Sequence, residues 1–177
     1  MNTIETERLI LRPITEDDAE ALFEYCRNEH VGPNAGWKPH ESLEDTREIM
    51  KLIFLDKENV YGMVLKETGK LIGSIGLVAD PKRQNDQTRM VGYAVDENYW
   101  NKGYATEALQ ALIRFGFEHL GLQLISAYCY PFNKSSKKVL TKCGFQYEGI
   151  LHLAEKRYDG VVLDNECYYI TETAYAQ

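Results

Sequence analysis

The chain has 177 residues, 44% hydrophobic and 27% charged, and its 20 Lys and Arg against 27 Asp and Glu give a formal net charge of −7. This composition predicts one soluble, globular domain over residues 1–177 with a sizeable core. The acidic balance disfavours nucleic acid or an anionic membrane surface as the main partner. It is compatible with a cationic or amine substrate.

The chain also lacks the patterns of a secreted or membrane protein. No apolar run approaches the roughly 18 residues of a membrane span, and "MNTIETERLILRP" lacks the charged and apolar regions of a signal peptide. The cysteines have no metal-type spacing, so we expect no metal and a cytoplasmic protein with reduced, buried thiols at Cys26, Cys129, Cys143 and Cys167.

The first elements are a strand and two helices. "RLILRPI" predicts a strand that stops near Pro13, and Thr15 caps a helix that ends near Asn28. After a loop rich in Gly and Pro, Ser42 caps a second helix. The helical spacing predicts two buried faces, the first formed by Ala19, Leu22, Phe23 and Cys26 and the second by Thr46, Ile49, Met50 and Ile53.

Three strands are expected next. "VYGMVL" and "LIGSIGLV" predict a hairpin that turns at 67–69, and "RMVGYAV" follows a polar loop, "DPKRQNDQ". A helix should then run from Tyr104 to about His119, burying one face formed by Ala105, Leu109, Leu112, Ile113 and Gly116, with Gly121 as its stop.

The last part predicts the strand "LISAYCY", a short helix over 133–143 and two strands that turn at Asp159–Gly160. The complete order of elements predicts a single mixed-sheet α/β or α+β domain.

The stretch "NYWNKGYATEAL" joins a strand directly to a helix. Helix starts carry unpaired N–H groups and a positive dipole end, which suit a phosphate. Gly103 would let the backbone approach an anion, and Lys102 adds a positive charge. The nucleotide patterns G-x-x-x-x-G-K-[ST] and G-x-G-x-x-G are absent. Taken alone, the residues allow either a phosphate site or an ordinary strand-to-helix turn.

"YWNKGYATEAL" resembles the pyrophosphate-binding loop of the GNAT superfamily of acyl-CoA-dependent N-acetyltransferases, [QR]-x-x-G-x-[GA]. Gly103 and Ala105 match the last two positions of this pattern. Trp100 stands where Gln or Arg is usual, a departure typical of the ribosomal-protein (RimJ/RimL-like) branch. "TERLILRPITEDDAEAL", "GWKPHESLEDT" and "NKSSKKVLTKCGFQYEG" extend the likeness in the right order. The resemblance implies a mixed, mostly antiparallel sheet of about seven strands with splayed central strands, flanked by about four helices.

The resemblance also implies acetyl-CoA as co-substrate and a set of binding residues. The pyrophosphate would lie on the backbone amides of Asn101, Lys102, Gly103, Tyr104, Ala105 and Thr106. The pantetheine and the acetyl oxygen would be held by N–H groups of Tyr93, Ala94 and Val95, which could equally be plain core strand. Asn133 would contact the coenzyme's amide region or act only as an N-cap, and Ser136 would be a weak catalytic donor near the sulfur.

Two familiar catalytic positions of the family are altered. Leu140 stands where many relatives have a tyrosine acid, and Met90 where many have a glutamate. The base is therefore open, with Glu41, His40 and Tyr128 as residual candidates. Trp37 and His40 would line the acceptor cleft, or would only anchor their loop.

Three hypotheses remain at this point. The first is an N-acetyltransferase for a protein or peptide N-terminal amine. The second is an enzyme for a small amine, such as an aminoglycoside, a polyamine or an amino-acid analogue. The third is an acyl-CoA-binding module with little turnover. The exposed edge of such a sheet also makes a homodimer possible.

Overall fold

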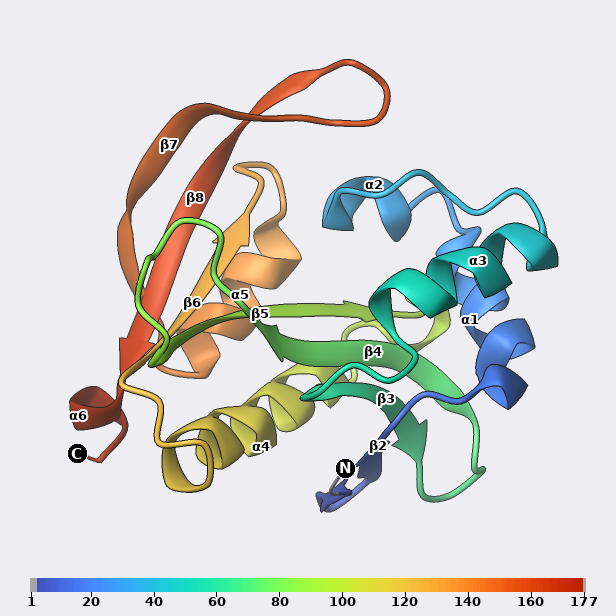
Figure 1. Ribbon diagram of the computed structural model, residues 1–177, viewed down its shortest axis with the longest axis horizontal. Coiled ribbons are helices and arrows are strands. Elements are labelled where there is room, and N and C mark those ends of the chain that lie inside the picture. The colour runs from blue at the N-terminus through green and yellow to red at the C-terminus, as the bar shows by residue number, and fades with distance from the viewer. Residues whose placement is uncertain (1–2, 177) are drawn as a thin grey trace. The chain divides into compact units, whose positions relative to one another are not determined.

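The computed structural model describes residues 3–176, within which eight strands and six helices are found (Figure 1). The strands form one mixed, mostly antiparallel sheet in the order β1-β2-β3-β4-β5-β6-β8-β7. The predicted fold class is confirmed, and the excess over the predicted counts comes mainly from short elements. These are the two-residue strand β1 (Ile4–Glu5) and the four-residue helices α2 (Gly32–Ala35) and α6 (Glu172–Tyr175).

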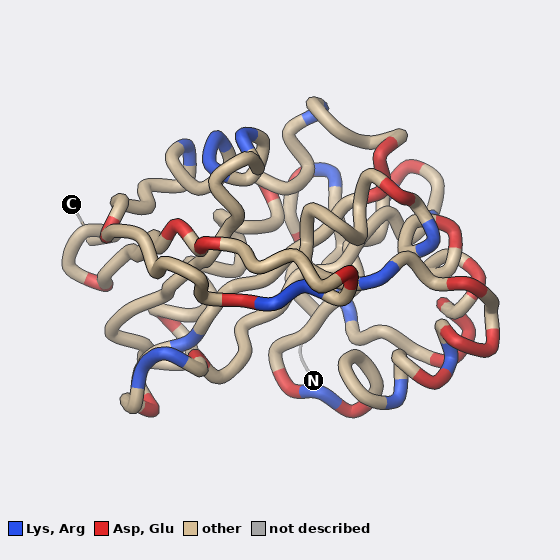
Figure 2. The backbone as a smooth tube through the Cα atoms, turned by 90° about the horizontal axis from the view of Figure 1, so that it is seen from above, with Lys and Arg blue, Asp and Glu red and all other residues tan. Residues whose placement is uncertain are grey.

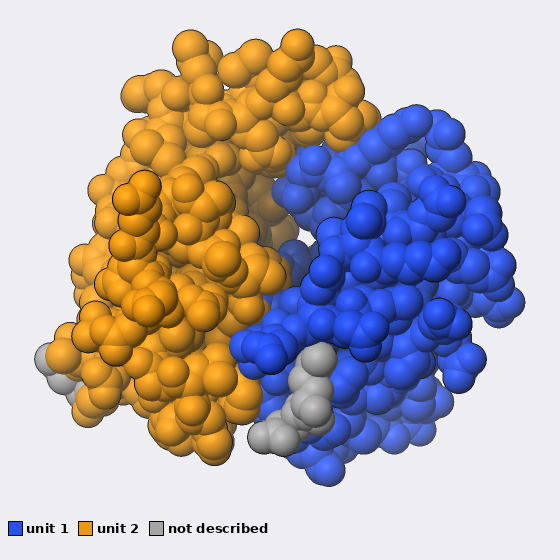
Figure 3. All heavy atoms as spheres, viewed as in Figure 1, with its two compact units in different colours: residues 1–76, 93–111 blue, residues 77–92, 112–177 orange. Residues whose placement is uncertain are grey.

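The chain divides into two compact units, coloured in Figure 3. Unit 1 comprises Met1–Gly76 and Tyr93–Ala111, and unit 2 comprises Leu77–Gly92 and Leu112–Gln177. Three elements contribute residues to both units: β4 (Leu71–Val78), β5 (Thr88–Val95) and α4 (Tyr104–Glu118). Each unit is described by itself.

Unit 1 is an antiparallel sheet with two helices that pack against each other. The strand pairs join β1 to β2 (Leu9–Arg12), β2 to β3 (Val60–Leu65) and β3 to β4. Every residue of β3 is buried, as expected for a strand covered on both faces. Helices α1 (Ala19–Cys26) and α3 (Leu43–Ile53) lie side by side (Figure 1).

Both predicted helix faces need one correction. In α1 the fully buried aromatic residue is Tyr25 rather than Phe23, because its hydroxyl donates a hydrogen bond to the buried Ser74, at 3.0 Å. In α3 the side chain of Ile53 is 50% exposed, because the helix ends there and the chain turns Phe54 into the core instead. Thr46 and Met50 are buried as predicted.

Unit 2 is built on three strands and a short helix. Strand β8 (Val162–Thr171) lies between β6 (Leu124–Cys129) and β7 (Gln146–Lys156), antiparallel to both. Strand β5 pairs in parallel with β6 from Thr88 to Met90; the predicted splay of these strands beyond that pairing stays a prediction. Helix α5 spans Lys134–Lys142.

Several local predictions are confirmed. All four cysteines are buried, and Gly121 ends the α4 region in the left-handed conformation, with φ of 63°. The hairpin turns at Asp159–Gly160, where Gly160 N–H donates to the carbonyl of Arg157 at 2.9 Å. Over residues 3–176, no helix combines the length and apolar character needed to cross a membrane. Acidic and basic segments are interspersed along the chain (Figure 2).

Candidate functional site

The loop between β5 and α4 has a fixed and unusual backbone. A short 3₁₀ turn, Glu97–Tyr99, follows β5, and the indole Nε1 of Trp100 donates to the carbonyl of Val95 at 2.7 Å. Asn101 and Gly103 then adopt left-handed φ angles of 59° and 83°. Successive amides in which the backbone hand alternates form concave, anion-binding surfaces. Trp100, where the family pattern has Gln or Arg, thus ties the start of the loop to the strand.

The start of α4 completes this concave backbone. The first backbone hydrogen bond of the helix runs from Glu107 N–H to the carbonyl of Gly103, at 3.0 Å. The backbone N–H groups of this first turn lie at the positive end of the helix dipole. Lys102 bonds back to the carbonyl of Asn98, at 3.0 Å, so its charge stays beside the loop. The arrangement can hold an anion through backbone donors.

The strand that enters the loop packs unusually close to β4. A Cβ atom on Gly73 would lie 2.3 Å from the carbonyl oxygen of Ala94, so only glycine fits there. Asp96 N–H donates to the carbonyl of Ile72 at 2.8 Å, and Ala94 and Val95 are buried while Tyr93 is half-buried. Ala94 and Val95 are therefore part of the core of unit 1, and the proposed role of Tyr93–Val95 as a donor of N–H groups stays a prediction.

Trp37 and His40 are held firmly within unit 1. The Nδ1 of His40 lies 2.9 Å from the Thr46 hydroxyl, and its backbone N–H donates to the carbonyl of Cys26 at 3.1 Å. Burial lowers the pKa of His40, so the ring is neutral at pH 7. Trp37 packs on the core, and its indole N–H is buried without a hydrogen-bond partner among residues 3–176. This geometry favours loop anchoring, and contact with a substrate stays a prediction.

The remaining predicted residues lie in unit 2 or on the surface. Asn133 caps α5 by accepting the N–H of Ser136 at 3.1 Å. Leu140, at the position where many relatives have a tyrosine acid, is fully buried. Glu41 is exposed and pairs with Lys38 at 2.5 Å, in an arrangement typical of a solvated charge.

A buried polar cluster in unit 2 was missed from the sequence. The carboxylate of Asp80, with a fully buried side chain, accepts hydrogen bonds from Ser126 (2.5 Å), Tyr128 (2.9 Å) and Arg83 (3.1 Å). Arg83 also pairs with Glu148. The segment "DPKRQNDQ" reads as an ordinary polar loop; the available signal was the two polar side chains on one face of "LISAYCY", at Ser126 and Tyr128.

The cluster determines the charge of its members. Burial alone would raise the pKa of Asp80, but the hydrogen bonds from Ser126, the Lys82 N–H, Tyr128 and Arg83 outweigh it, and the pKa is lowered. Burial and the bond to Asp80 raise the pKa of Tyr128 to about 12. Tyr128 therefore keeps its proton at neutral pH, which argues against it as a base and leaves it a hydroxyl donor.

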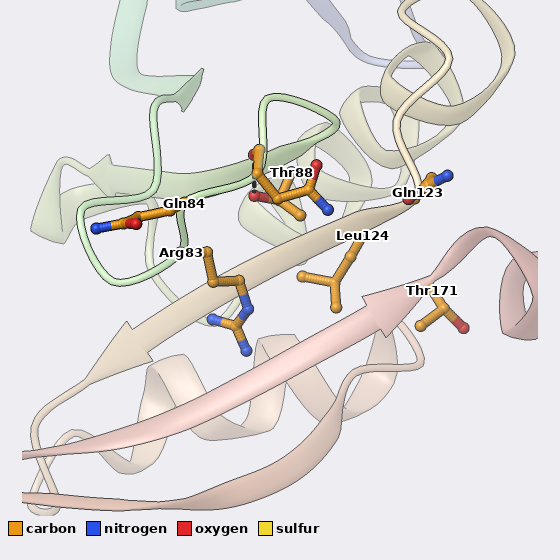
Figure 4. A pocket seen from close by; sticks show the side chains of 7 residues that line it. Arg83, Gln84, Thr88, Gln123, Leu124 and Thr171 are labelled. Carbon is orange, nitrogen blue, oxygen red and sulfur yellow. Dashed lines mark hydrogen bonds between the residues drawn. The ribbon is translucent and has the colours of Figure 1, made fainter.

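A hollow of about 460 Å³ lies beside this cluster, within unit 2. Figure 4 shows Arg83 and Gln84 on the loop after β4, Leu124 at the start of β6 and Thr171 at the end of β8. Arg83 is already paired with two carboxylates, so the hollow offers amide and hydroxyl groups rather than an unpaired charge. None of the residues predicted for the site lines it.

Comparison with known proteins identifies the family. The family described as "Acetyltransferase (GNAT) domain" matches residues 8–146, so the chain belongs to the GNAT family of N-acetyltransferases, which use acetyl-CoA.

Three individual proteins illustrate the likeness. The chain is 35% identical to the uncharacterized N-acetyltransferase YoaA of Bacillus subtilis, over 84% of this chain and 85% of that protein. It is 29% identical to the ribosomal-protein-serine acetyltransferase of Escherichia coli, over 89% and 92%. A GNAT-family acetyltransferase structure from Bacillus anthracis superposes with a TM-score of 0.85 and 29% identity, covering 97% of this chain and 99% of that one.

Proposed function

We propose that this N-acetyltransferase transfers the acetyl group of acetyl-CoA to the N-terminal α-amine of a protein or peptide, as a RimJ/RimL-like member of the family. Its likeness to the ribosomal-protein-serine acetyltransferase of Escherichia coli, over 92% of that protein, supports this acceptor class. An N-terminal amine has a pKa near 8, so a useful fraction is neutral at pH 7. A lysine side chain, with a pKa near 10.4, would demand a stronger base.

The observation that carries the donor site is the backbone of the loop before α4. Left-handed residues at Asn101 and Gly103, followed directly by a helix start, present amides to an anion. The coenzyme pyrophosphate binds to the amides from Asn101 to Thr106, and Lys102 contributes a nearby positive charge.

The reaction is a direct attack in a ternary complex. The amine nitrogen bonds to the acetyl carbonyl carbon, the C–S bond breaks, the thiolate takes a proton and the attacking nitrogen loses one. N–H groups of Tyr93 to Val95 stabilise the carbonyl oxygen as its negative charge develops. Asn133 contacts the amide region of the coenzyme, and Ser136 donates near the sulfur.

The acceptor lies against the loop that carries Trp37. His40, neutral and bonded to Thr46, holds this loop in place. Tyr128, whose hydroxyl proton goes to Asp80, is a further proposed acceptor contact. Water relays the proton from an α-amine, since Met90 offers no carboxylate. The physiological compartment proposed for this reaction is the cytoplasm.

The acceptor class is tested by thiol release from acetyl-CoA with pooled amines. The pools contain peptides with open N-termini, polyamines, aminoglycosides or amino acids, each compared with a blank that lacks acceptor. Release with the peptide pool supports the proposal. Thiol release only with a small-amine pool would show that the acceptor is a small amine and not a peptide. No release in any pool, with acetyl-CoA still bound, indicates a binding module with little turnover.

A further inference from the structure

The side chain of Arg8, just before β2, contacts both the loop before α4 and the start of α4. Its Nη1 donates to the carbonyl of Lys102 at 2.9 Å, and its Nε donates to the carboxylate of Glu107 at 2.7 Å. The guanidinium also lies over the ring of Tyr104, 4.5 Å from the centroid. One side chain thus contacts residues before, at and after the helix start.

Further hydrogen bonds fix the backbone of Arg8 and the carboxylate of Glu107. Arg8 donates its own N–H to Glu107, at 2.7 Å, and its carbonyl accepts the N–H of Lys66, at 3.0 Å. The Thr6 hydroxyl donates to the same Glu107 carboxylate at 2.6 Å. Three donors therefore hold the Glu107 carboxylate: the backbone N–H and the Nε of Arg8, and the hydroxyl of Thr6. Together they tie this segment to the start of α4.

The contact with Lys102 controls the direction of an amide. In a trans peptide the C=O and the following N–H point in opposite directions. Because Arg8 holds the Lys102 carbonyl toward itself, the N–H of Gly103 points away from Arg8. Gly103 is one of the amides proposed to bind the pyrophosphate, so Arg8 sets the direction of that donor.

The contact with Glu107 removes an electrostatic conflict. A carboxylate in the first turn of a helix is stabilised by the helix dipole, but it repels an anion bound at the same end. The side chain of Glu107 is only 17% exposed, so water screens it poorly, and the guanidinium of Arg8 offsets its charge.

We infer that Arg8 is a positioning residue for the donor site: it aims the Gly103 amide and neutralises Glu107, so that the loop accepts the coenzyme pyrophosphate. This inference rests on the proposed role of the loop from Asn101 to Thr106. It assigns no contact between Arg8 and the substrate.

The test compares CoA with pantetheine, which has the same thiol arm but no pyrophosphate. Arg8→Gln should weaken CoA binding roughly tenfold, about 1.4 kcal/mol, and leave pantetheine binding unchanged. Calorimetry measures CoA, and competition against CoA measures pantetheine. Adding Glu107→Gln should restore part of the CoA affinity, because the uncompensated carboxylate is then gone.

Two further variants make the outcome decisive. Arg12→Gln breaks a comparable ion pair at the end of β2, with Asp18 at 2.7 Å, and should leave both affinities unchanged. Gly103→Val reports on the loop itself. If Gly103→Val weakens CoA binding and Arg8→Gln does not, Arg8 has no positioning role. Equal loss of CoA and pantetheine in Arg8→Gln would show a merely structural role, and CoA binding unaffected by either change would overturn the proposed loop site.

Discussion

At the scale of single residues, the proposed donor site depends more on backbone conformation than on side-chain chemistry. Asn101 and Gly103 take left-handed φ angles, which Asn and Gly adopt at least cost. The sequence pattern and the family resemblance located this loop, since Gly and Asn have recognisable conformational roles. The Asp80 cluster could not be assembled from the sequence, because only tertiary folding brings Asp80 and Arg83 beside Ser126 and Tyr128.

Gly103→Val should abolish detectable acetyl-CoA binding while the protein still folds. A β-branched residue is strained at φ of 83°, and its Cβ would lie 3.3 Å from Nη2 of Arg8. Gly69→Val is the matched control, because Gly69 has φ of 69° with nothing within 4 Å of the added Cβ. Calorimetry with acetyl-CoA measures both. Equal affinities in the two variants would remove the loop from the binding site.

Asp80→Asn should lower the free energy of unfolding at pH 7 by about 3 kcal/mol, because it leaves the buried partners of a carboxylate uncompensated. The folded state lowers the pKa of Asp80, so its contribution is fully present above the unfolded value, about 3.9. That contribution is lost as the pH falls through the lower folded value.

Urea denaturation of wild type and Asp80→Asn at pH 7 and in acid measures this effect. The difference between the two proteins should shrink in acid. Asp159→Asn, in an exposed pair with Arg157, should change stability little. A difference that is constant with pH would show that the charge of Asp80 is not what stabilises the cluster.

At the scale of helices and strands, local signals predicted most elements. Ser42 and Asn133 cap their helices as expected, by accepting N–H groups of Asp45 and Ser136. Capping depends on neighbours three residues away, so sequence alone reveals it. The exposed Ile53 shows where prediction from local sequence fails. The residue at which a helix ends, and which side chain is buried there, depend on the tertiary packing around it.

The two possible roles of Asn133 can be separated by Asn133→Ser. Serine keeps the cap, so the fold should hold its stability, while loss of the side-chain amide should weaken CoA binding several-fold. Ser42→Ala is the control: it should cost about 1 kcal/mol of stability without affecting CoA binding. Thermal unfolding and calorimetry provide the two readouts. Wild-type affinity in Asn133→Ser would make Asn133 a cap alone.

Leu153, in strand β7, has a left-handed φ of 50° although its side chain is 76% exposed. Its strain is about 1–2 kcal/mol, more than the roughly 0.5–1 kcal/mol that glycine costs in flexibility. Leu153→Gly should therefore leave stability unchanged or raise it by up to about 1 kcal/mol. Leu151→Gly, at a neighbouring exposed position, should lower it. If urea denaturation shows that Leu153→Gly and Leu151→Gly lower the free energy of unfolding equally, Leu153 is not strained.

At the scale of the whole molecule, the mixed sheet and the GNAT family were predictable because several motifs occur in the right order along one chain. The division into two compact units was not, since β4, β5 and α4 each read as one continuous element. The acceptor is the part least determined by the sequence. The loop with Trp37 and His40 is proposed to contact the acceptor, and its packing depends on tertiary structure.

The most direct test of the proposed function maps the acetylated atom. A peptide with an open N-terminus and one internal lysine, and the same peptide with a blocked N-terminus, are incubated with the enzyme and acetyl-CoA. Fragment masses then locate the added acetyl group. Acetylation of the α-amine in the first peptide and none in the second is the predicted result. Acetylation of the lysine in both, or transfer only to a small amine supplied as competitor, would contradict it.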